Sequence, residues 1–281
     1  GASNTAVGYN ALLSNTTGTR NVSVGASAGA AITTGSYNVL MGTYTGDAIT
    51  TGEQNVALGD AAFTTNTTGT DNVAVGDQAL KANTTASNNT AVGSSALLAN
   101  TTGTRNVAVG PYALDANTTA SYNIAIGYQT LGTNITGVNN VAIGDSALFA
   151  NTADSNVAIG YQSMVTNTSG TLNVAVGSGS LGANTTGANN TASGIGSLQS
   201  NTTASNNSAF GRLALQANTT GTANVAMGET PLYTNTTGNF NVGLGNAALY
   251  ANTTASNNTA VGYAALTANT TGGGNTADGT A

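Results

Sequence analysis

A five-residue pattern, Asn-x-small-apolar-Gly, returns every 17 residues along the chain. It begins at Asn4 and recurs in steps of 17 up to Asn140, resumes one residue early at Asn156, and then continues in steps of 17 to Asn275. A Gly stands four residues after each Asn of the pattern. A fixed period of this kind is typical of repeat proteins, in which each repeat packs on its neighbours. The chain is therefore restricted to architectures built by stacking.

One copy, residues 106–122, illustrates what each repeat can form. Val107 and Val109 flank Ala108, and this alternation with period two predicts a short β-strand. A second strand is predicted around a large apolar residue later in the repeat: Leu80, Leu97, Leu114 and Leu249, with Phe63 and Met164 as substitutes. Between them, Gly-rich and Asn-Thr-Thr-Gly stretches are typical of corners.

A helical solenoid is the rival architecture. Its helix pairs usually take about 33 to 47 residues, so 17 residues are too few. Gly, Asn and Thr are also poor helix formers. We therefore predict an all-β fold, a parallel β-solenoid or β-roll of about 16 coils with 17-residue repeats. It forms one repeat domain over residues 1–281, a rod that is a segment of a longer fibre or filament.

The one short repeat indicates where a coil tolerates deletion. Its missing residue falls in the segment 151–156, where other copies read like residues 117–123. A one-residue slip inside a strand would turn its side chains to the wrong face. The deletion therefore predicts a turn at this place.

The recurring Asn and Gly have physical explanations within the repeat. Gly allows a positive φ or a close approach of two backbones, which predicts a tight corner or a crowded seam. Asn can bond turn backbone through its side chain and can form an amide ladder along the stack. Both columns are interpreted as structural, and their central members are Asn72, Gly76, Asn89, Gly93, Asn106, Gly110, Asn123 and Gly127.

Two consecutive copies depart from the pattern in the same way. Gly29 and Gly46 replace the Leu, while Ile32 and Ile49 replace the second Asn of the repeat. We expect the Ile side chains to turn inward and fill the space that Leu leaves. These coils should have a locally altered cross-section, and they are a place to look for a bend or a contact with another subunit.

The charge and composition narrow the possible partners. The net charge is −6, and the four bases, Arg20, Lys81, Arg105 and Arg212, are scattered, whereas nucleic-acid binding needs clustered Lys and Arg. No apolar run reaches the 18 or so residues that a membrane-spanning helix needs. We expect no nucleic-acid partner and no membrane insertion.

Catalysis and cofactor binding have little support in the residue types. The chain has no His and no Cys, which removes the common nucleophile–base pairs and thiolate metal sites. Gly177, Gly179 and Gly182 match a dinucleotide fingerprint, but neither a long helix nor a ribose-binding acid is expected after them. Asp60 and Asp77 follow the repeat Gly in consecutive coils, so they are a weak candidate pair for a cation or for glycoside hydrolysis. Their simpler interpretation is a solvent-facing column, and we predict no enzyme and no cofactor.

Other surface columns suggest binding functions. Tyr9, Tyr128, Tyr161 and Tyr263 occupy one repeat position and could offer aromatic rings to a glycan. Regular Thr stacks raise the alternative of ice binding, although adjacent Thr residues such as Thr118 and Thr119 would point apart in an extended chain. The Asn-Thr-Thr triplets also match the N-glycosylation pattern. A Thr- or Tyr-face binding module for ice or glycan is therefore the alternative to a structural role.

The energetics of one thin coil favour association. Ordering backbone costs about 1 to 2 kcal/mol per residue, whereas each coil buries only about three small or medium apolar side chains worth about 1.5 to 3 kcal/mol each. Further burial through small-residue faces would compensate. We therefore expect self-association.

The repeat resembles those of two groups of fibrous proteins. The Asn-Val-Ala-Val-Gly and Asn-Thr-Ala-Val-Gly pentads are similar to repeats in the heads of trimeric autotransporter adhesins. The longer unit at residues 89–103, Asn-Thr-Ala-Val-Gly-Ser-Ser-Ala-Leu-Leu-Ala-Asn-Thr-Thr-Gly, is more similar to repeats of phage tail fibres. The resemblance implies a left-handed, homotrimeric, extracellular β-roll on a virion or cell surface. It implies a structural or adhesive fibre whose partners are copies of itself, as a trimer or head-to-tail filament, and a host-surface glycan.

Overall fold

The computed structural model describes residues 1–280, and the chain divides into two compact units. Unit 1 is Gly1–Asn139 and unit 2 begins at Asn140. Each unit is a parallel β-solenoid, and the two together contain about 16 coils with the predicted 17-residue spacing. The described residues contain no helix, and hence none that could cross a membrane. This confirms the all-β solenoid and excludes the helical alternative.

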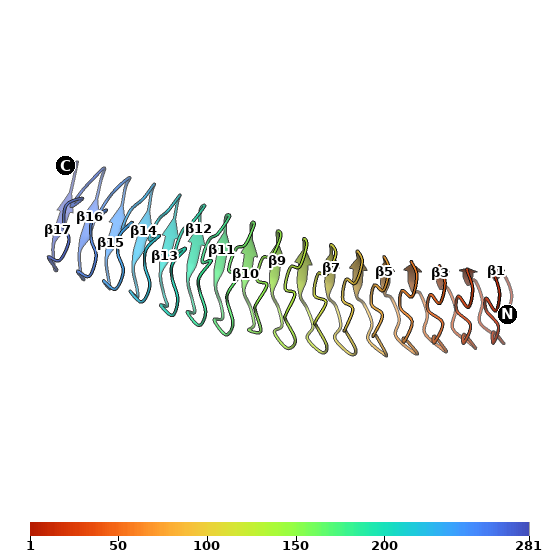
Figure 1. The fold of residues 1–281 in the computed structure, drawn as a ribbon. Coiled ribbons are helices and arrows are strands. Elements are labelled where there is room, and N and C mark those ends of the chain that lie inside the picture. The colour runs from red at the N-terminus through yellow and green to blue at the C-terminus, as the bar shows by residue number, and fades with distance from the viewer. Residues whose placement is uncertain (281) are drawn as a thin grey trace. The chain divides into compact units, whose positions relative to one another are not determined.

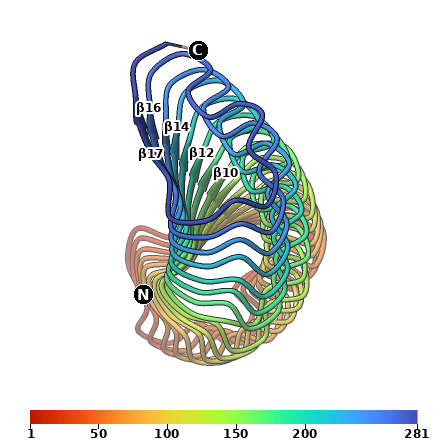
Figure 2. The same ribbon diagram turned by 90° about the vertical axis from the view of Figure 1, so that its left-hand side faces the viewer.

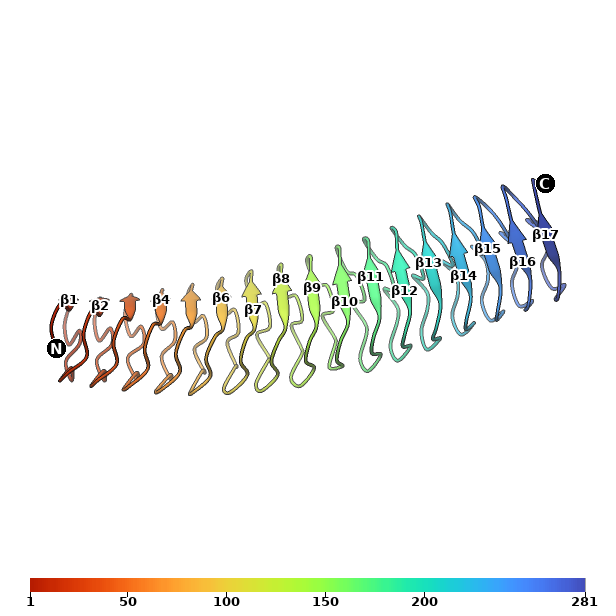
Figure 3. The same cartoon turned by 180° about the vertical axis from the view of Figure 1, so that it is seen from behind.

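Every coil contributes one strand of three residues (Figure 1). In unit 1 these are β1 (Thr5–Val7), β2 (Val22–Val24), β3 (Val39–Met41), β4 (Val56–Leu58), β5 (Val73–Val75), β6 (Thr90–Val92), β7 (Val107–Val109) and β8 (Ile124–Ile126). In unit 2 they are β9 (Val141–Ile143), β10 (Val157–Ile159), β11 (Val174–Val176), β12 (Thr191–Ser193), β13 (Ser208–Phe210), β14 (Val225–Met227), β15 (Val242–Leu244), β16 (Thr259–Val261) and β17 (Thr276–Asp278). Within each unit, successive strands pair in parallel, and Figure 3 shows their arrows running the same way.

The pairing register follows the repeat. Val107 lies opposite Ile124, one 17-residue step away. In the short coil the step is 16 residues, and Val141 still lies opposite Val157. The register confirms that the deletion lies outside the strand, where the chain can lose a residue without exchanging the buried and exposed faces.

Positions within a coil are numbered here from the repeat Asn, so that residues 106–122 are positions 1–17. Figure 2 looks into the coils of unit 2, with the strands forming one wall and the turns forming the wall opposite. The interior between them is narrow and takes side chains from six positions. In the coil of residues 106–122, in unit 1, these are Asn106, Ala108, Ala113, Leu114, Asn117 and Ala120, all at most 2% exposed.

The predicted second strand around the position-9 Leu is wrong. This stretch is a series of turns in each coil, and Leu114 has a φ of +52° while Tyr112 has +56°. A strand cannot contain such left-handed residues, and it would place adjacent side chains on opposite faces, whereas Ala113 and Leu114 are both buried. In the sequence, the signal against a strand is the adjacent apolar pair Ala113 and Leu114, where a half-buried strand would alternate apolar and polar residues.

The turns are nevertheless bonded from coil to coil as regularly as the strands. Leu97 N–H donates to the carbonyl of Ala113 at 2.9 Å, and Ala99 N–H donates to that of Asp115 at 3.0 Å. Because each non-Pro residue must place its backbone donor and acceptor, this ladder stabilises conformations that would be strained in isolation.

Candidate functional site

The repeat Asn residues form a buried amide ladder. Asn106 donates its backbone N–H to Asn89 Oδ1 at 3.0 Å, and its side-chain amide donates to the same oxygen at 3.3 Å and to the carbonyl of Ala120 at 2.9 Å. Asn123 N–H then donates to Asn106 Oδ1 at 3.0 Å, which continues the ladder. Members at most 1% exposed include Asn72, Asn89, Asn106 and Asn123. Burying an amide is costly without partners, so the ladder explains how a polar column occupies the core.

The position-12 Asn forms a second ladder inside the same coils. Asn117 Nδ2 donates to Asn100 Oδ1 at 2.9 Å and to the carbonyl of Ala120 at 3.1 Å, and Asn117 has no exposed surface. This Asn begins the Asn-Thr-Thr triplet. The amide nitrogen of Asn117 therefore already has two hydrogen-bond partners and is buried. The folded coil does not present this Asn to solvent as a glycan acceptor.

The repeat Gly marks a close approach between coils. Gly110 has a φ of +130°, and a Cβ added there would lie 2.5 Å from the carbonyl oxygen of Gly127. A Cβ on Gly76 would lie equally close to the oxygen of Gly93. Contacts below about 3 Å cannot be accommodated without moving the backbone of the next coil. The same backbone conformation, with φ of +130° to +135°, is adopted by Gly76, Gly93, Gly110 and Gly127.

The two atypical coils of unit 1 confirm the expected inward turn of Ile. Ile32 and Ile49 have no exposed surface, and their Cδ1 atoms would lie only 3.0 Å and 2.8 Å from a Cβ added to Gly29 and Gly46. Leu40, which replaces the usual Ala at position 3, fills the remaining space and approaches both glycines. The core therefore keeps its packing by exchanging which positions carry the large side chains.

The acidic candidates lie on the surface. Asp60 and Asp77 are both exposed, and Asp77 Oδ2 accepts a hydrogen bond from Gln78 Nε2 at 3.2 Å. Residues 1–280 contain no group of three or more His, Cys, Asp or Glu placed to hold a metal ion. The exposed positions of Asp60 and Asp77 agree with the simpler interpretation, a column of side chains that face solvent.

The position-6 Tyr residues also lie on the surface. Tyr161 in unit 2 is 55% exposed. In unit 1, Tyr128 contacts Tyr112 edge to face, with ring centroids 6.1 Å apart. Two further aromatic contacts repeat at position 17, where the guanidinium groups of Arg20 and Arg105 lie over the rings of Tyr37 and Tyr122 and hydrogen-bond the phenol oxygens. Sequence reasoning missed these pairs, although each Arg stands 17 residues before its Tyr.

The outward face of the strands is apolar in both units. Position 3 points inward, so positions 2 and 4 point outward, and both usually hold Val, Ile or Leu. Ile124 and Ile126 on β8 are each 38% exposed, as are Val174 and Val176 on β11. Contiguous apolar surface of this kind is rare on monomeric proteins and marks interaction sites. We call this surface the strand face.

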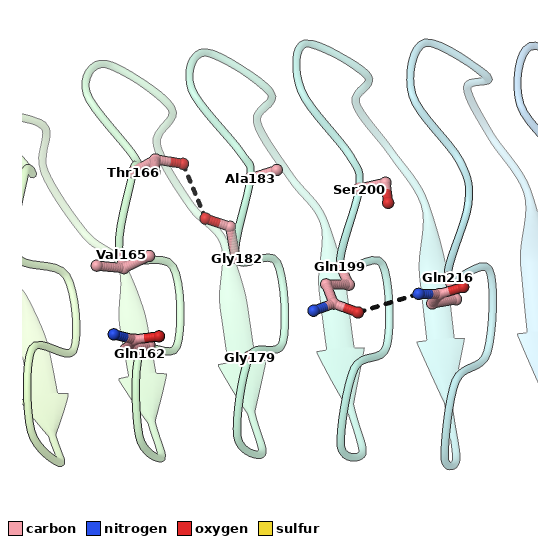
Figure 4. Close-up of a pocket in the computed structure, with 9 residues that line it drawn as sticks. All are labelled: Gln162, Val165, Thr166, Gly179, Gly182, Ala183, Gln199, Ser200 and Gln216. Carbon is pink, nitrogen blue, oxygen red and sulfur yellow. Dashed lines mark hydrogen bonds between the residues drawn. The ribbon is translucent and has the colours of Figure 1, made fainter.

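A groove lies on the turn side of unit 2 (Figure 4). It has a volume of about 520 Å³ and spans four successive coils at positions 7, 10 and 11. Its floor lies at Gly179 and Gly182. At position 10 both neighbouring coils carry side chains, Val165 and Gln199, whereas at position 7 the preceding coil carries Gln162 and the following coil has Gly196. Sequence reasoning considered these two glycines only within a dinucleotide fingerprint. The signal it missed is two glycines in one coil at outward positions.

No protein-family model matches the chain, and the comparison with curated proteins gives no match.

Proposed function

We propose that the chain is a structural segment of an extracellular fibre, on a virion or a cell surface, and that copies of it associate as a homotrimer through the strand face. The extracellular setting, the left-handed coil and the number three rest on the resemblance of the repeats. The proposal gives the chain no catalytic role and no cofactor. Its partners are copies of itself, with adhesion to a host glycan or head-to-tail joining as further properties of the assembled fibre.

The observation that carries the proposal is the strand face. A solvated β-surface normally alternates apolar inward with polar outward residues. Here both the inward and the outward face of the strand are apolar. Ala175 is fully buried, while Val174 and Val176 on either side of it point outward. Covering such a surface releases about 25 cal/mol per Å² of apolar area. Association is therefore expected to supply stability that one narrow coil lacks.

The laddered backbone supports a role as a stiff spacer. Within each unit, successive coils are bonded through their strands, their turns and the position-1 Asn column, and coils that carry Asn at position 12 are also bonded through a second Asn column. The interior leaves no room for a ligand, since the Ala and Leu side chains of successive coils fill it. Such an element holds its ends at a defined separation, which is what a fibre segment does.

The test is the solution mass of the 281-residue chain by light scattering over a concentration series. We expect a stable mass of three times 27.2 kDa, and dissociation of the assembly in the double variant Val174→Glu/Val176→Glu, because charges would be buried at the interface. Ile195→Glu, at an exposed position outside the strand face, is the matched control and should leave the mass unchanged. A folded monomer would overturn the trimer, and open-ended growth would indicate a filament instead.

A second candidate function, ice binding, has one specific observation in its favour. Position 14 carries an exposed Thr in eight consecutive coils of unit 1, and these are Thr17, Thr34, Thr51, Thr68, Thr85, Thr102, Thr119 and Thr136. The adjacent position-13 hydroxyls are used internally, as Thr101 Oγ1 donates to the carbonyl of Thr118 at 3.0 Å. Thermal hysteresis that disappears in Thr85→Tyr/Thr102→Tyr, but persists in the exposed control Asn246→Tyr, would support this function. Absence of hysteresis in the unaltered chain would exclude it.

A further inference from the structure

We propose that the groove of unit 2 is a binding site for a neutral saccharide. The groove is formed where Gly179 and Gly182 interrupt two columns of outward side chains (Figure 4). Its volume of about 520 Å³ lies within the range of about 300 to 1,000 Å³ that is usual for small-molecule sites. The site lies within one chain, so the proposal goes beyond the structural role and does not depend on the trimer.

The rim of the groove is made of primary amides. Gln162 lies on one side, and Gln199 and Gln216 lie on the other. Gln216 Nε2 donates to Gln199 Oε1 at 3.0 Å, which fixes the orientation of both amides. This bond leaves the N–H groups of Gln199 as donors, and Gln199 Nε2 lies on the side of Gly179 (Figure 4). An amide that offers donor and acceptor side by side matches the paired hydroxyl groups of a sugar.

The floor and the far wall offer mostly apolar contact. Gly182 N–H donates to the carbonyl of Gly179 at 3.2 Å, and Thr166 Oγ1 donates to the carbonyl of Gly182 at 2.8 Å. These backbone groups already have partners, so an extended peptide would find few backbone groups to pair with. Val165 and Ala183 line the same groove and can contact the C–H face of a sugar ring. Recognition therefore depends on the amides of the rim.

The charge of the site favours a neutral ligand. None of the nine lining residues is ionisable. Arg212, in the same coil as Gln216, is paired with Glu229 at 3.1 Å. A phosphate or carboxylate ligand would meet no fixed positive charge here, whereas hydroxyl groups would meet oriented donors and acceptors.

The test uses the full chain and neutral hexasaccharides as probes: maltohexaose, cellohexaose, laminarihexaose, mannohexaose and chitohexaose. Binding is detected by saturation-transfer NMR and quantified by calorimetric titration. An alginate hexasaccharide serves as the anionic probe. We expect at least one neutral probe to bind, and to bind more tightly than the anionic one.

The decisive variant fills the groove without straining the coil. Gly179 has a φ of +65°, and an added Cβ would have Gln199 Nε2 as its nearest atom at 3.7 Å, which is ordinary contact. Gln162 and Gln78 occupy the same repeat position with φ of +51° and +56°, so Gly179→Gln should fold. It should weaken binding at least about tenfold, a loss of about 1.4 kcal/mol. Ala247→Gln, at the same repeat position and outside the groove, is the matched control and should bind normally.

A second variant tests the chemistry of the rim. Gln199→Ala enlarges the groove but removes the oriented amide, so it should also weaken binding if the amides recognise the ligand. Failure of every neutral probe to bind, equal binding by Gly179→Gln, or preference for the anionic probe would each overturn the proposal. The light-scattering mass of the same samples separates this outcome from the structural role, because a monomer that binds saccharide would overturn the trimer alone.

Discussion

Asn106 lies directly over Asn89 inside unit 1, and the side-chain oxygen of Asn89 accepts both the backbone N–H and the side-chain amide of Asn106. The neighbouring coil repeats this geometry, since Asn123 N–H donates to Asn106 Oδ1 at 3.0 Å. One residue type thus satisfies its own amide and the backbone that follows it, in a core position with no exposed surface. The interior of the coil depends on this polar column as much as on its Leu and Ala side chains.

Removing one rung of this ladder should be costly. Asn106→Ala leaves the Asn123 N–H without its acceptor and removes the side-chain amide that donates to Asn89 Oδ1 and to the carbonyl of Ala120, so we expect a loss of about 3 kcal/mol in the free energy of unfolding. Urea unfolding of the full chain, followed by circular dichroism, measures the change. The exposed Asn246→Ala should lose less than about 0.5 kcal/mol, and equal losses in the two variants would contradict a special role for the ladder.

The repeat Gly should tolerate no side chain. Gly110→Ala combines a strained φ with a Cβ 2.5 Å from the carbonyl oxygen of Gly127, and we expect a loss of about 3 kcal/mol or more. Gly279 has a similar φ of +122°, but nothing lies within 4 Å of its added Cβ. Thermal unfolding of Gly110→Ala and Gly279→Ala separates the two effects. If both variants lose the same stability, close packing between coils is not the reason for the Gly.

One substitution should stabilise the chain. Ser23 is fully buried at position 3, where most coils have Ala, and its hydroxyl has no hydrogen-bond partner within the described residues. Ser23→Ala removes an unsatisfied polar group without creating a large cavity, so we expect a gain of about 1 kcal/mol. The same denaturant titration measures it. Ser163→Ala is the control. Ser163 Oγ is hydrogen-bonded to Ser180 Oγ at 3.0 Å, so removal of this hydroxyl should not stabilise the chain.

Asp115 should make a small, pH-dependent contribution to stability. Burial raises the pKa of Asp115 above its ordinary value of 3.8, although hydrogen bonds from its own backbone N–H and from Ala116 lower it in part. Because the folded pKa is the higher one, the folded state binds the proton more tightly. The contribution of Asp115 is then most favourable below the unfolded pKa and is lost as pH rises through the folded pKa.

The comparison with Asp115→Asn isolates this effect. Relative to that variant, the unaltered chain should melt at a progressively lower temperature as pH rises from below the ordinary pKa of 3.8 through the raised pKa of the folded state, and the difference should then be constant. Asp47 occupies the same repeat position, and burial raises its pKa too, so Asp47→Asn should behave alike. A difference between the chain and Asp115→Asn that is independent of pH would contradict the raised pKa.

The sequence by itself determined the coil. A strict 17-residue period, with alternating Val-Ala-Val and residues unsuited to helices, permits little other than a parallel β-solenoid, and the deletion before Asn156 could be assigned to a turn because strand register forbids it elsewhere. The exchange of Gly29 and Ile32 could be predicted because a filled core conserves volume. These conclusions depend on periodicity and packing, which are local properties repeated many times.

Only the tertiary structure decided what happens between coils. The Leu114 segment is predicted from the sequence to form a strand, yet it adopts left-handed turns, and the next coil supplies partners for its backbone groups. The same stacking buries both Asn columns, so the Asn of each buried Asn-Thr-Thr triplet is not presented at the surface. It also opens a groove where Gly179 and Gly182 coincide with the amides of the following coils. Contacts between successive coils set all three features, and no single repeat contains them.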